Sequence, residues 1–124
     1  MRRLLKESDI ERVVYSYLDS QDYRVIVEDV ETHVGKIKTP VYYFTTDPSS
    51  GYADMTYENW RQMLFVTTEL CEEIKNYFGF EDTFDALLVI SDWAYNKIGK
   101  KIEREMNYGK HSFMGDNKFV FETE

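Results

Sequence analysis

The strongest constraint on the fold is a change of hydrophobic periodicity near residue 20. Before that point, apolar residues recur at the spacing that places them on one face of a helix. These residues are Ile10, Val13, Val14, Tyr17 and Leu18. Ser8 and Glu11 have the spacing of a capping box, in which each side chain satisfies a free backbone N–H of the first turn. The pattern therefore predicts a helix over residues 9–19.

After that point, β-branched and aromatic residues dominate two runs, residues 23–30 and residues 37–46. Such residues suit the pleated surface of a sheet. Gly35 lies among polar residues between the runs and is suited to a turn, so the two runs predict an antiparallel hairpin. Pro40 has no N–H to donate to a neighbouring strand, so we expect the start of the second strand to lie at a sheet edge.

Helical spacing returns in the second half of the chain. A second helix is predicted from Thr56, a suitable N-cap, to a stop at Gly79. The residues on its predicted buried face are Trp60, Met63, Leu64, Thr67, Leu70, Cys71, Ile74, Tyr77 and Phe78. A third helix is predicted from Asp82 or Thr83 to about Asn107. Its main apolar face comprises Phe84, Leu87, Leu88, Tyr95, Ile98, Ile102 and Met106.

The C-terminal residues predict one or two short strands. Residues 111–114 and 118–121 flank a turn at residues 115–117, so they form either a second hairpin or one strand added to the first sheet. The order of elements is then α-β-β-α-α-β(β). This order predicts an α+β domain in which three helices cover an antiparallel sheet of three or four strands. The 124 residues contain no linker, so we expect a single domain over residues 1–124.

The charge of the chain is strongly acidic and unevenly distributed. Lysine and arginine number 15 against 23 aspartate and glutamate residues, a net charge of −8. Residues 47–92 contain ten acidic residues against two basic ones, Arg61 and Lys75, so this segment alone carries −8. Such a charge repels nucleic-acid phosphates and anionic membranes, and no apolar run is long enough to span a bilayer. We therefore expect neither nucleic acid nor membrane as a direct partner.

The sequence contains no pattern typical of an active site or a metal centre. His33 and His111 lie far apart and belong to no H-x-x-x-H or H-E-x-x-H motif. Cys71 lies on the apolar face of the predicted second helix, where a thiol behaves as a small buried hydrophobe. We therefore expect no catalytic activity, no metal ion and no cofactor. A single cysteine cannot form an intramolecular disulfide, which favours the reducing cytoplasm.

One aromatic residue of the predicted second helix stands apart from its apolar face. Phe65 points away from that face, and charged side chains surround it at helical spacing. We predict that Phe65 anchors a partner within a charged rim. The residues of this predicted partner-binding set are Phe65, Glu58, Arg61, Glu69 and Glu72. The alternative is that Phe65 lies under the loop of residues 47–56 or under another helix.

The predicted third helix has a second apolar stripe opposite its main face. This Trp93 stripe consists of Ala86, Val89, Ile90 and Trp93. A helix that is apolar on both sides must be covered on both sides. Either the helix lies between the sheet and another helix, or the Trp93 stripe is an oligomer interface that forms a homodimer or binds a partner.

These features favour a non-enzymatic protein that binds a basic surface of a larger protein, such as a surface that otherwise binds nucleic acid. In composition the chain resembles the small acidic proteins with which phages, plasmids and toxin systems block basic enzymes. The resemblance implies an inhibitor or an immunity-type protein, as in anti-defence, whose carboxylates imitate phosphates. Two alternatives stay open. One is a self-associating structural or accessory protein that uses the Trp93 stripe, and the other is a small enzyme or ligand-binding protein with a carboxylate-lined pocket.

Overall fold

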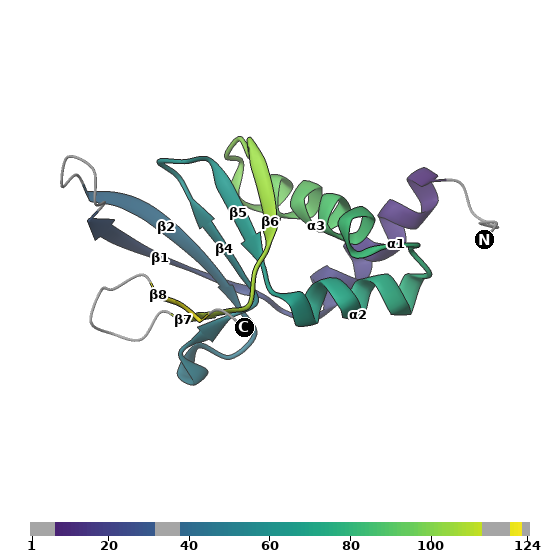
Figure 1. Ribbon diagram of the computed structural model, residues 1–124, viewed down its shortest axis with the longest axis horizontal. Coiled ribbons are helices and arrows are strands. Elements are labelled where there is room, and N and C mark those ends of the chain that lie inside the picture. The colour runs from purple at the N-terminus through teal and green to yellow at the C-terminus, as the bar shows by residue number, and fades with distance from the viewer. Residues whose placement is uncertain (1–6, 32–37, 113–119, 123–124) are drawn as a thin grey trace.

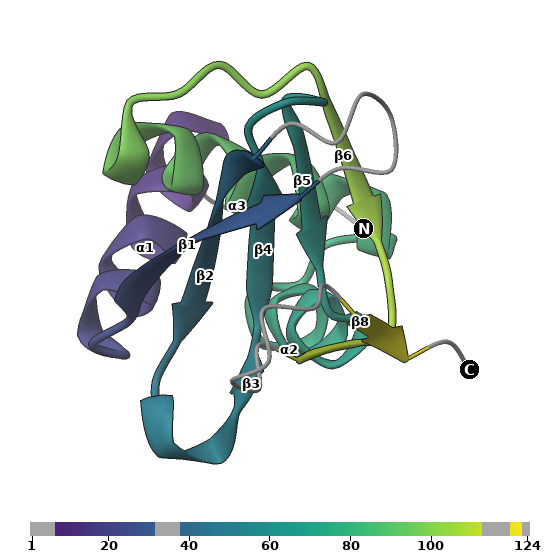
Figure 2. The ribbon, with the colours of Figure 1, turned by 90° about the vertical axis from the view of Figure 1, so that its left-hand side faces the viewer.

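A computed structural model describes residues 7–31, 38–112 and 120–122 of the chain (Figure 1). Its helices are α1 (Glu7–Ser20), α2 (Thr68–Phe78) and α3 (Thr83–Ile98). Its strands are β1 (Arg24–Glu31), β2 (Lys38–Thr45), β3 (Tyr52–Ala53), β4 (Met55–Glu58), β5 (Met63–Val66), β6 (Arg104–Asn107), β7 (Lys110–Ser112) and β8 (Val120–Glu122). The three helices lie to one side of the main sheet, on the right in Figure 1 and behind the sheet in Figure 2.

Five strands form the main sheet in the order β1-β2-β4-β5-β6. Neighbouring strands run antiparallel except β5 and β6, which run parallel because α2 and α3 connect them. A second sheet of three antiparallel strands has the order β3-β7-β8. The fold thus confirms the predicted α+β class, with three helices on a largely antiparallel sheet, but the number and order of the strands differ from the prediction.

The main hydrophobic core lies between the sheet and the helices. Phe44, Tyr57 and Leu64, from three neighbouring strands, are fully buried in one cluster with Leu18 of α1 and Ile90 of α3. A smaller cluster consists of Val30, Val41, Tyr43 and Ala53, with Ile26 packed against it. The members of this cluster in β1 and β2 alternate with residues that face the helices, so they lie on the other face of the sheet. The central strands are therefore buried on both faces.

The predicted N-terminal helix and the hairpin that follows it are confirmed. β1 and β2 pair antiparallel along their whole length, and the predicted turn residue Gly35 lies outside the described residues. β4 pairs with the other edge of β2 only from Val41 to Phe44, so no described strand pairs with the start of β2 on that side, as predicted. Pro40 lies just beyond that pairing, whose last pair joins Val41 to Glu58. The ladder between β2 and β4 therefore does not require an N–H from Pro40.

The predicted second helix is wrong over its first half. Residues 55–58 and 63–66 form β4 and β5, and Gln62 turns the chain between them with a φ of 51°. Every residue of both strands is buried, including Thr56 and Glu58 of β4, and β5 is apolar throughout, so neither strand has the exposed polar face of a half-exposed strand. The helix is capped instead by Thr67, whose hydroxyl accepts a hydrogen bond from a backbone N–H three residues later at 3.3 Å. The predicted stop at Gly79 is confirmed.

The predicted third helix begins where expected but ends earlier. Asp82 caps α3 by accepting a hydrogen bond from the backbone N–H of Asp85 at 2.9 Å. The helix ends at Ile98, because Gly99 adopts a left-handed φ of 66° that caps the last turn. Residues 104–107 form β6 instead of continuing the helix.

The predicted C-terminal hairpin is present as β7 and β8, which pair antiparallel. It belongs to the second sheet, where β3 pairs with β7, and it adds no strand to the main sheet. The predicted turn at residues 115–117 lies outside the described part of the chain.

Candidate binding surface

The predicted partner anchor, Phe65, does not lie on the surface. It belongs to β5, and only 3% of it is exposed. Its ring packs edge-on against Tyr108, with the two ring centroids 5.8 Å apart. The helical placement that directed Phe65 toward solvent is wrong, so Phe65 offers no exposed aromatic group to a partner.

Two other members of the predicted set lie beside Phe65 in a structural ion pair. The guanidinium of Arg61 pairs with the carboxylate of Glu58 and lies 5.5 Å from the centroid of the Phe65 ring. Glu58 is only 2% exposed, and this burial raises its pKa, whereas the hydrogen bond and charge of Arg61 lower it. The structure therefore brings Glu58, Arg61 and Phe65 together, but in the packing of the sheet and not on a helical surface.

The remaining members of the predicted set, Glu69 and Glu72, are exposed on α2. Glu69 lies in the first turn, where the partial positive charge of the helix N-terminus favours a carboxylate. These two residues are therefore the part of the predicted set that a partner could reach.

The predicted oligomer interface is also buried. The four residues of the Trp93 stripe lie in the main core, and Trp93 itself is 3% exposed. The indole ring packs against Phe44 and Tyr23, and its N–H donates to the Asp19 carboxylate at 3.0 Å. The opposite face of α3 reaches the surface instead, with Phe84, Leu88 and Tyr95 exposed. The Trp93 stripe is thus covered within the fold and offers no oligomer interface, and of the predicted main face Leu87 is buried while Phe84, Leu88 and Tyr95 are exposed.

A groove between α1 and α3 combines the exposed side chain of Leu88 and more deeply placed apolar side chains with carboxylates. It has a volume of about 190 Å³. We call it the acidic groove and define it by its lining residues, which are Ile10, Glu11, Phe80, Asp85, Leu88, Val89 and Asp92. One carboxylate comes from α1 and two come from α3, so the site exists only where these two helices pack together.

The carboxylates of the acidic groove have no cationic partner in the described part of the structure. No ion pair involves Glu11, Asp85 or Asp92 there. The pKa of Tyr15 is raised first by burial and then by the charges of two of these carboxylates, Asp92 and Glu11. Among the described residues, the groove therefore presents negative charge without an ion-pair partner beside apolar side chains.

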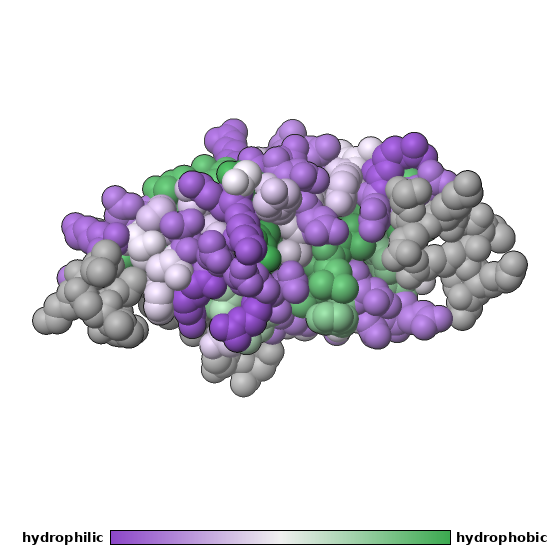
Figure 3. Space-filling view, turned by 90° about the horizontal axis from the view of Figure 1, so that it is seen from above, coloured by the Kyte–Doolittle hydropathy of each residue, from purple (hydrophilic) through white to green (hydrophobic). Residues whose placement is uncertain are grey.

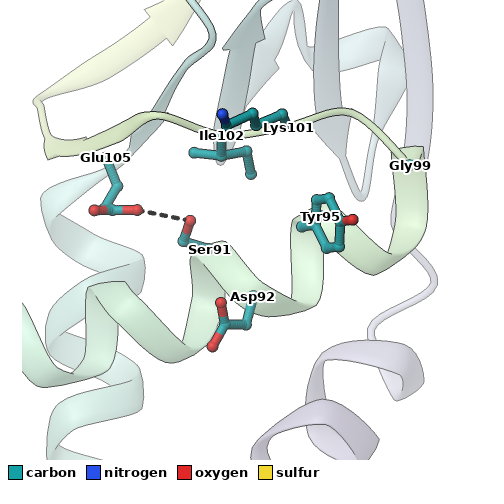
Figure 4. Close-up of a pocket in the computed structure, with 7 residues that line it drawn as sticks. All are labelled: Ser91, Asp92, Tyr95, Gly99, Lys101, Ile102 and Glu105. Carbon is teal, nitrogen blue, oxygen red and sulfur yellow. Dashed lines mark hydrogen bonds between the residues drawn. The ribbon is translucent and has the colours of Figure 1, made fainter.

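A larger cavity of about 540 Å³ adjoins the acidic groove and shares Asp92 with it. Ser91 and Tyr95 project from α3 toward the segment that carries Ile102 and Glu105, and Asp92 points away from that segment (Figure 4). The Ser91 hydroxyl donates to the Glu105 carboxylate at 2.9 Å. The cavity thus offers polar groups for recognition.

One face of the molecule is mainly hydrophilic. Figure 3, which views the molecule from above, shows purple residues over most of this face and apolar residues gathered in patches between them.

No family model, curated protein or solved structure matches this chain. Within residues 7–31, 38–112 and 120–122, no three His, Cys, Asp or Glu side chains gather in a way that could hold a metal ion. None of the described helices has the length and hydropathy to cross a membrane. Cys71 is buried as predicted, and burial raises its pKa to about 12.

A second acidic cluster, which the sequence patterns did not indicate, joins α1, α2 and the start of β4. The Tyr23 hydroxyl donates to the Asp54 carboxylate at 3.0 Å, and the Tyr17 hydroxyl donates to Glu73. The hydrogen bond to Glu73 is the main cause that raises the pKa of Tyr17 to about 12. Burial raises the pKa of Asp54, and the charges of Glu69 and Glu73 add to this effect, although the hydrogen bond from Tyr23 opposes it.

The raised pKa of Asp54 makes the stability of the protein depend on pH. The folded state holds the Asp54 proton more tightly than the unfolded state, so ionisation of this group reduces stability as pH rises from about 4. Asp54→Asn keeps an oxygen that accepts the Tyr23 proton and removes the charge. We expect the variant to melt above the wild type at pH 7 and the difference to shrink by pH 3. Thermal melts at both pH values measure this difference, with Glu72→Gln as the control for an exposed carboxylate. A difference in melting temperature between Asp54→Asn and the wild type that did not change with pH would contradict this prediction.

Proposed function

We propose that this protein is a non-enzymatic binding module whose helical layer binds a basic surface of a larger protein. The observation that carries the proposal is the acidic groove, where carboxylates without an ion-pair partner surround apolar side chains. A basic segment with apolar side chains would neutralise the carboxylates and cover the apolar floor in one step.

The charge of the helical layer supports this choice of partner. From the start of α2 to the end of α3, residues 68–98, the chain contains seven acidic residues against two basic ones, a net charge of −5. A field of one sign over one layer attracts an oppositely charged protein and speeds its association. The same field repels nucleic acid, so a protein surface is the favoured partner.

The apolar residues on the outer face of α3 supply the contact area that charges alone do not provide. Phe84 is 57% exposed, and Leu88 and Tyr95 are exposed on the same face one and three turns further along the helix. Exposed ion pairs contribute little to affinity, whereas apolar and aromatic groups at the centre of an interface contribute most of it. We therefore place the centre of the interface at Leu88 and its charged rim at Glu11, Asp85 and Asp92.

We further propose that the partner surface is one that otherwise binds nucleic acid, which would make this protein an inhibitor or an immunity-type protein. The support is chemical. Carboxylates held along a rigid helix carry negative charge, as the phosphates of a nucleic-acid backbone do. Basic side chains of the partner could therefore bind either of them. Asp85 and Asp92 are two turns apart on α3, about 10 Å along the helix axis.

A comparison of two charge-matched variants tests this proposal. Asp85→Asn/Asp92→Asn removes two charges from the acidic groove, and Glu69→Gln/Glu72→Gln removes two charges from α2. Each protein is immobilised and used to capture proteins from a host lysate at low and at physiological salt. We expect the wild type and the α2 variant to retain the same basic protein, and the groove variant to bind it about tenfold more weakly.

The control separates a specific interface from attraction by net charge. Equal loss in both variants would show that capture depends on overall charge and would overturn the assignment of the groove. Capture of no basic protein by the wild type at low salt would overturn the proposed function itself, because electrostatic attraction is strongest under that condition.

A further inference from the structure

β1 is the outermost strand of the main sheet at the end opposite β6. β2 pairs with one of its edges, and no other described strand pairs with the second edge. β1 crosses in front of β2 and β4 in Figure 2, so it lies on the outside of the molecule. Two of its apolar side chains, Val25 and Val27, are 41% and 52% exposed. A strand edge with exposed valines is a template for pairing with another strand.

Two charges on the opposite face of β1 also lack partners. Arg24 is exposed and Glu28 is half-buried, and neither forms an ion pair in the described part of the structure. Burial raises the pKa of Glu28, and among the described residues no cation lowers it. The two residues lie four positions apart in an extended strand, about 13 Å, so they cannot pair with each other within one chain.

Antiparallel pairing of β1 with its own copy permits few registers. Residues whose N–H and C=O groups point to the free edge alternate along a strand, and bonded pairs require such a residue on both chains. In a two-fold pair, the two residue numbers of each cross-strand pair must therefore add to an even number. The two-fold axis then passes midway between the same residue of the two copies. The residues that could occupy this central position are Val25, Ile26, Val27 and Glu28.

Only the register centred on Ile26 matches apolar with apolar side chains and opposite charges with each other. It places Val25 opposite Val27 of the second copy and Arg24 opposite Glu28 of the second copy, each twice by symmetry. We propose that β1 is a homodimer interface in which two copies of this chain pair antiparallel through residues 24–28. The two valine pairs cover the exposed face of β1, and the two ion pairs use the charges that one chain leaves unpaired.

The neighbouring registers fail on the same criteria. Centring on Glu28 places two carboxylates opposite each other. Centring on Val27 places Val25 opposite Asp29, and centring on Val25 places Arg24 opposite Ile26. Like charges or a charge against an apolar side chain at directly opposed positions destabilise a pair of strands. The sequence of β1 thus specifies one self-complementary pairing.

Complementary charge reversal tests this interface directly. Arg24→Glu gives a chain with two acidic residues at positions 24 and 28, and Glu28→Arg gives a chain with two basic residues there. In the proposed register each variant opposes like charges when alone and opposite charges when mixed with the other. We expect sedimentation equilibrium at about 0.15 M salt to show a dimer for the wild type, at least tenfold weaker dimerisation for each variant alone, and recovery in the equimolar mixture.

Controls separate this pairing from general charge effects and from unfolding. Lys100→Glu and Glu72→Arg make the same charge changes on residues outside β1, and we expect both to dimerise like the wild type. Thermal melts establish that each variant is folded. A wild type that stays monomeric up to about 1 mM, or reversed variants that do not recover when mixed, would overturn the proposal. The binding of a basic partner by the acidic groove is independent of either result, because β1 contributes no residue to that groove.

Discussion

Trp93→Ala is expected to lower the free energy of unfolding by about 4 kcal/mol, the loss typical of removing a large buried aromatic side chain. Trp93 is almost fully buried, and its ring centroid lies 5.6 Å from that of Tyr23 and 5.8 Å from that of Phe44. The substitution also removes the indole N–H that donates to Asp19, which Lys97 holds in an ion pair at 2.7 Å. Urea denaturation followed by circular dichroism measures the change.

Leu88→Ala is the matched control, because it shortens an apolar side chain on the exposed face of the same helix. We expect it to cost less than about 1 kcal/mol. Trp93→Phe keeps an aromatic ring but loses the hydrogen bond to Asp19, so its cost should lie between the two. If Leu88→Ala proved as costly as Trp93→Ala, the assignment of the Trp93 face of α3 to the core would be wrong.

Arg61→Ala is expected to lower the free energy of unfolding by about 3 kcal/mol, because it leaves the carboxylate of Glu58 buried without a cation. The guanidinium is itself partly exposed and also packs over the rings of Trp60 and Phe65. The variant therefore loses aromatic contacts as well as the ion pair.

The dependence of this loss on pH identifies its cause. Burial already raises the pKa of Glu58 in the folded state, and removal of Arg61 takes away the influence that lowers it. In the Arg61→Ala variant, Glu58 then binds a proton more readily in the folded state than in the unfolded chain. The loss of unfolding free energy relative to the wild type should therefore shrink as pH falls toward 4. Glu58→Gln/Arg61→Ala, which has no buried charge, should recover part of the stability at pH 7. A deficit that is constant with pH, with no recovery in the double variant, would show that aromatic packing alone explains the loss.

The elements that could be predicted from the sequence are those defined by local chemistry. The helix at residues 9–19 has an apolar stripe on one side only, and the hairpin after it consists of two β-branched runs. The side chain of Asp82 caps the start of α3, and Gly79 adopts the left-handed conformation that ends α2. Both boundaries were predicted correctly because each depends on one residue type.

The sequence pattern did not suffice where tertiary contacts decide between two structures that the same local pattern allows. The apolar residues of β4 and β5 fit helical spacing, and β5 is apolar throughout because both faces of this central strand are buried. In α3 both stripes are apolar, so the pattern cannot indicate which one faces the core. The small side chains of Ala86 and Ala94 on the buried face suit close packing, which is a signal the periodicity alone does not use.

The candidate site was even less accessible to prediction. Its acidic residues come from α1 and α3, which lie more than 60 positions apart in the sequence, and no described basic side chain forms an ion pair with them. The predicted set around Phe65 depended on one helical assignment and failed with it. The acidic balance of the helical layer, by contrast, follows directly from the composition of residues 68–98.

The parallel pairing of β5 with β6 determines when the chain can finish its sheet. Met63 is paired with Arg104, so this edge closes only after α2 and α3 have been synthesised and packed. Until then β5 is an open edge on a nascent four-stranded meander. The segment that arrives last at this edge also forms one wall of the 540 Å³ cavity beside α3, so the cavity exists only in chains that have completed the fold. A ligand of that cavity would therefore distinguish mature molecules from partly folded ones.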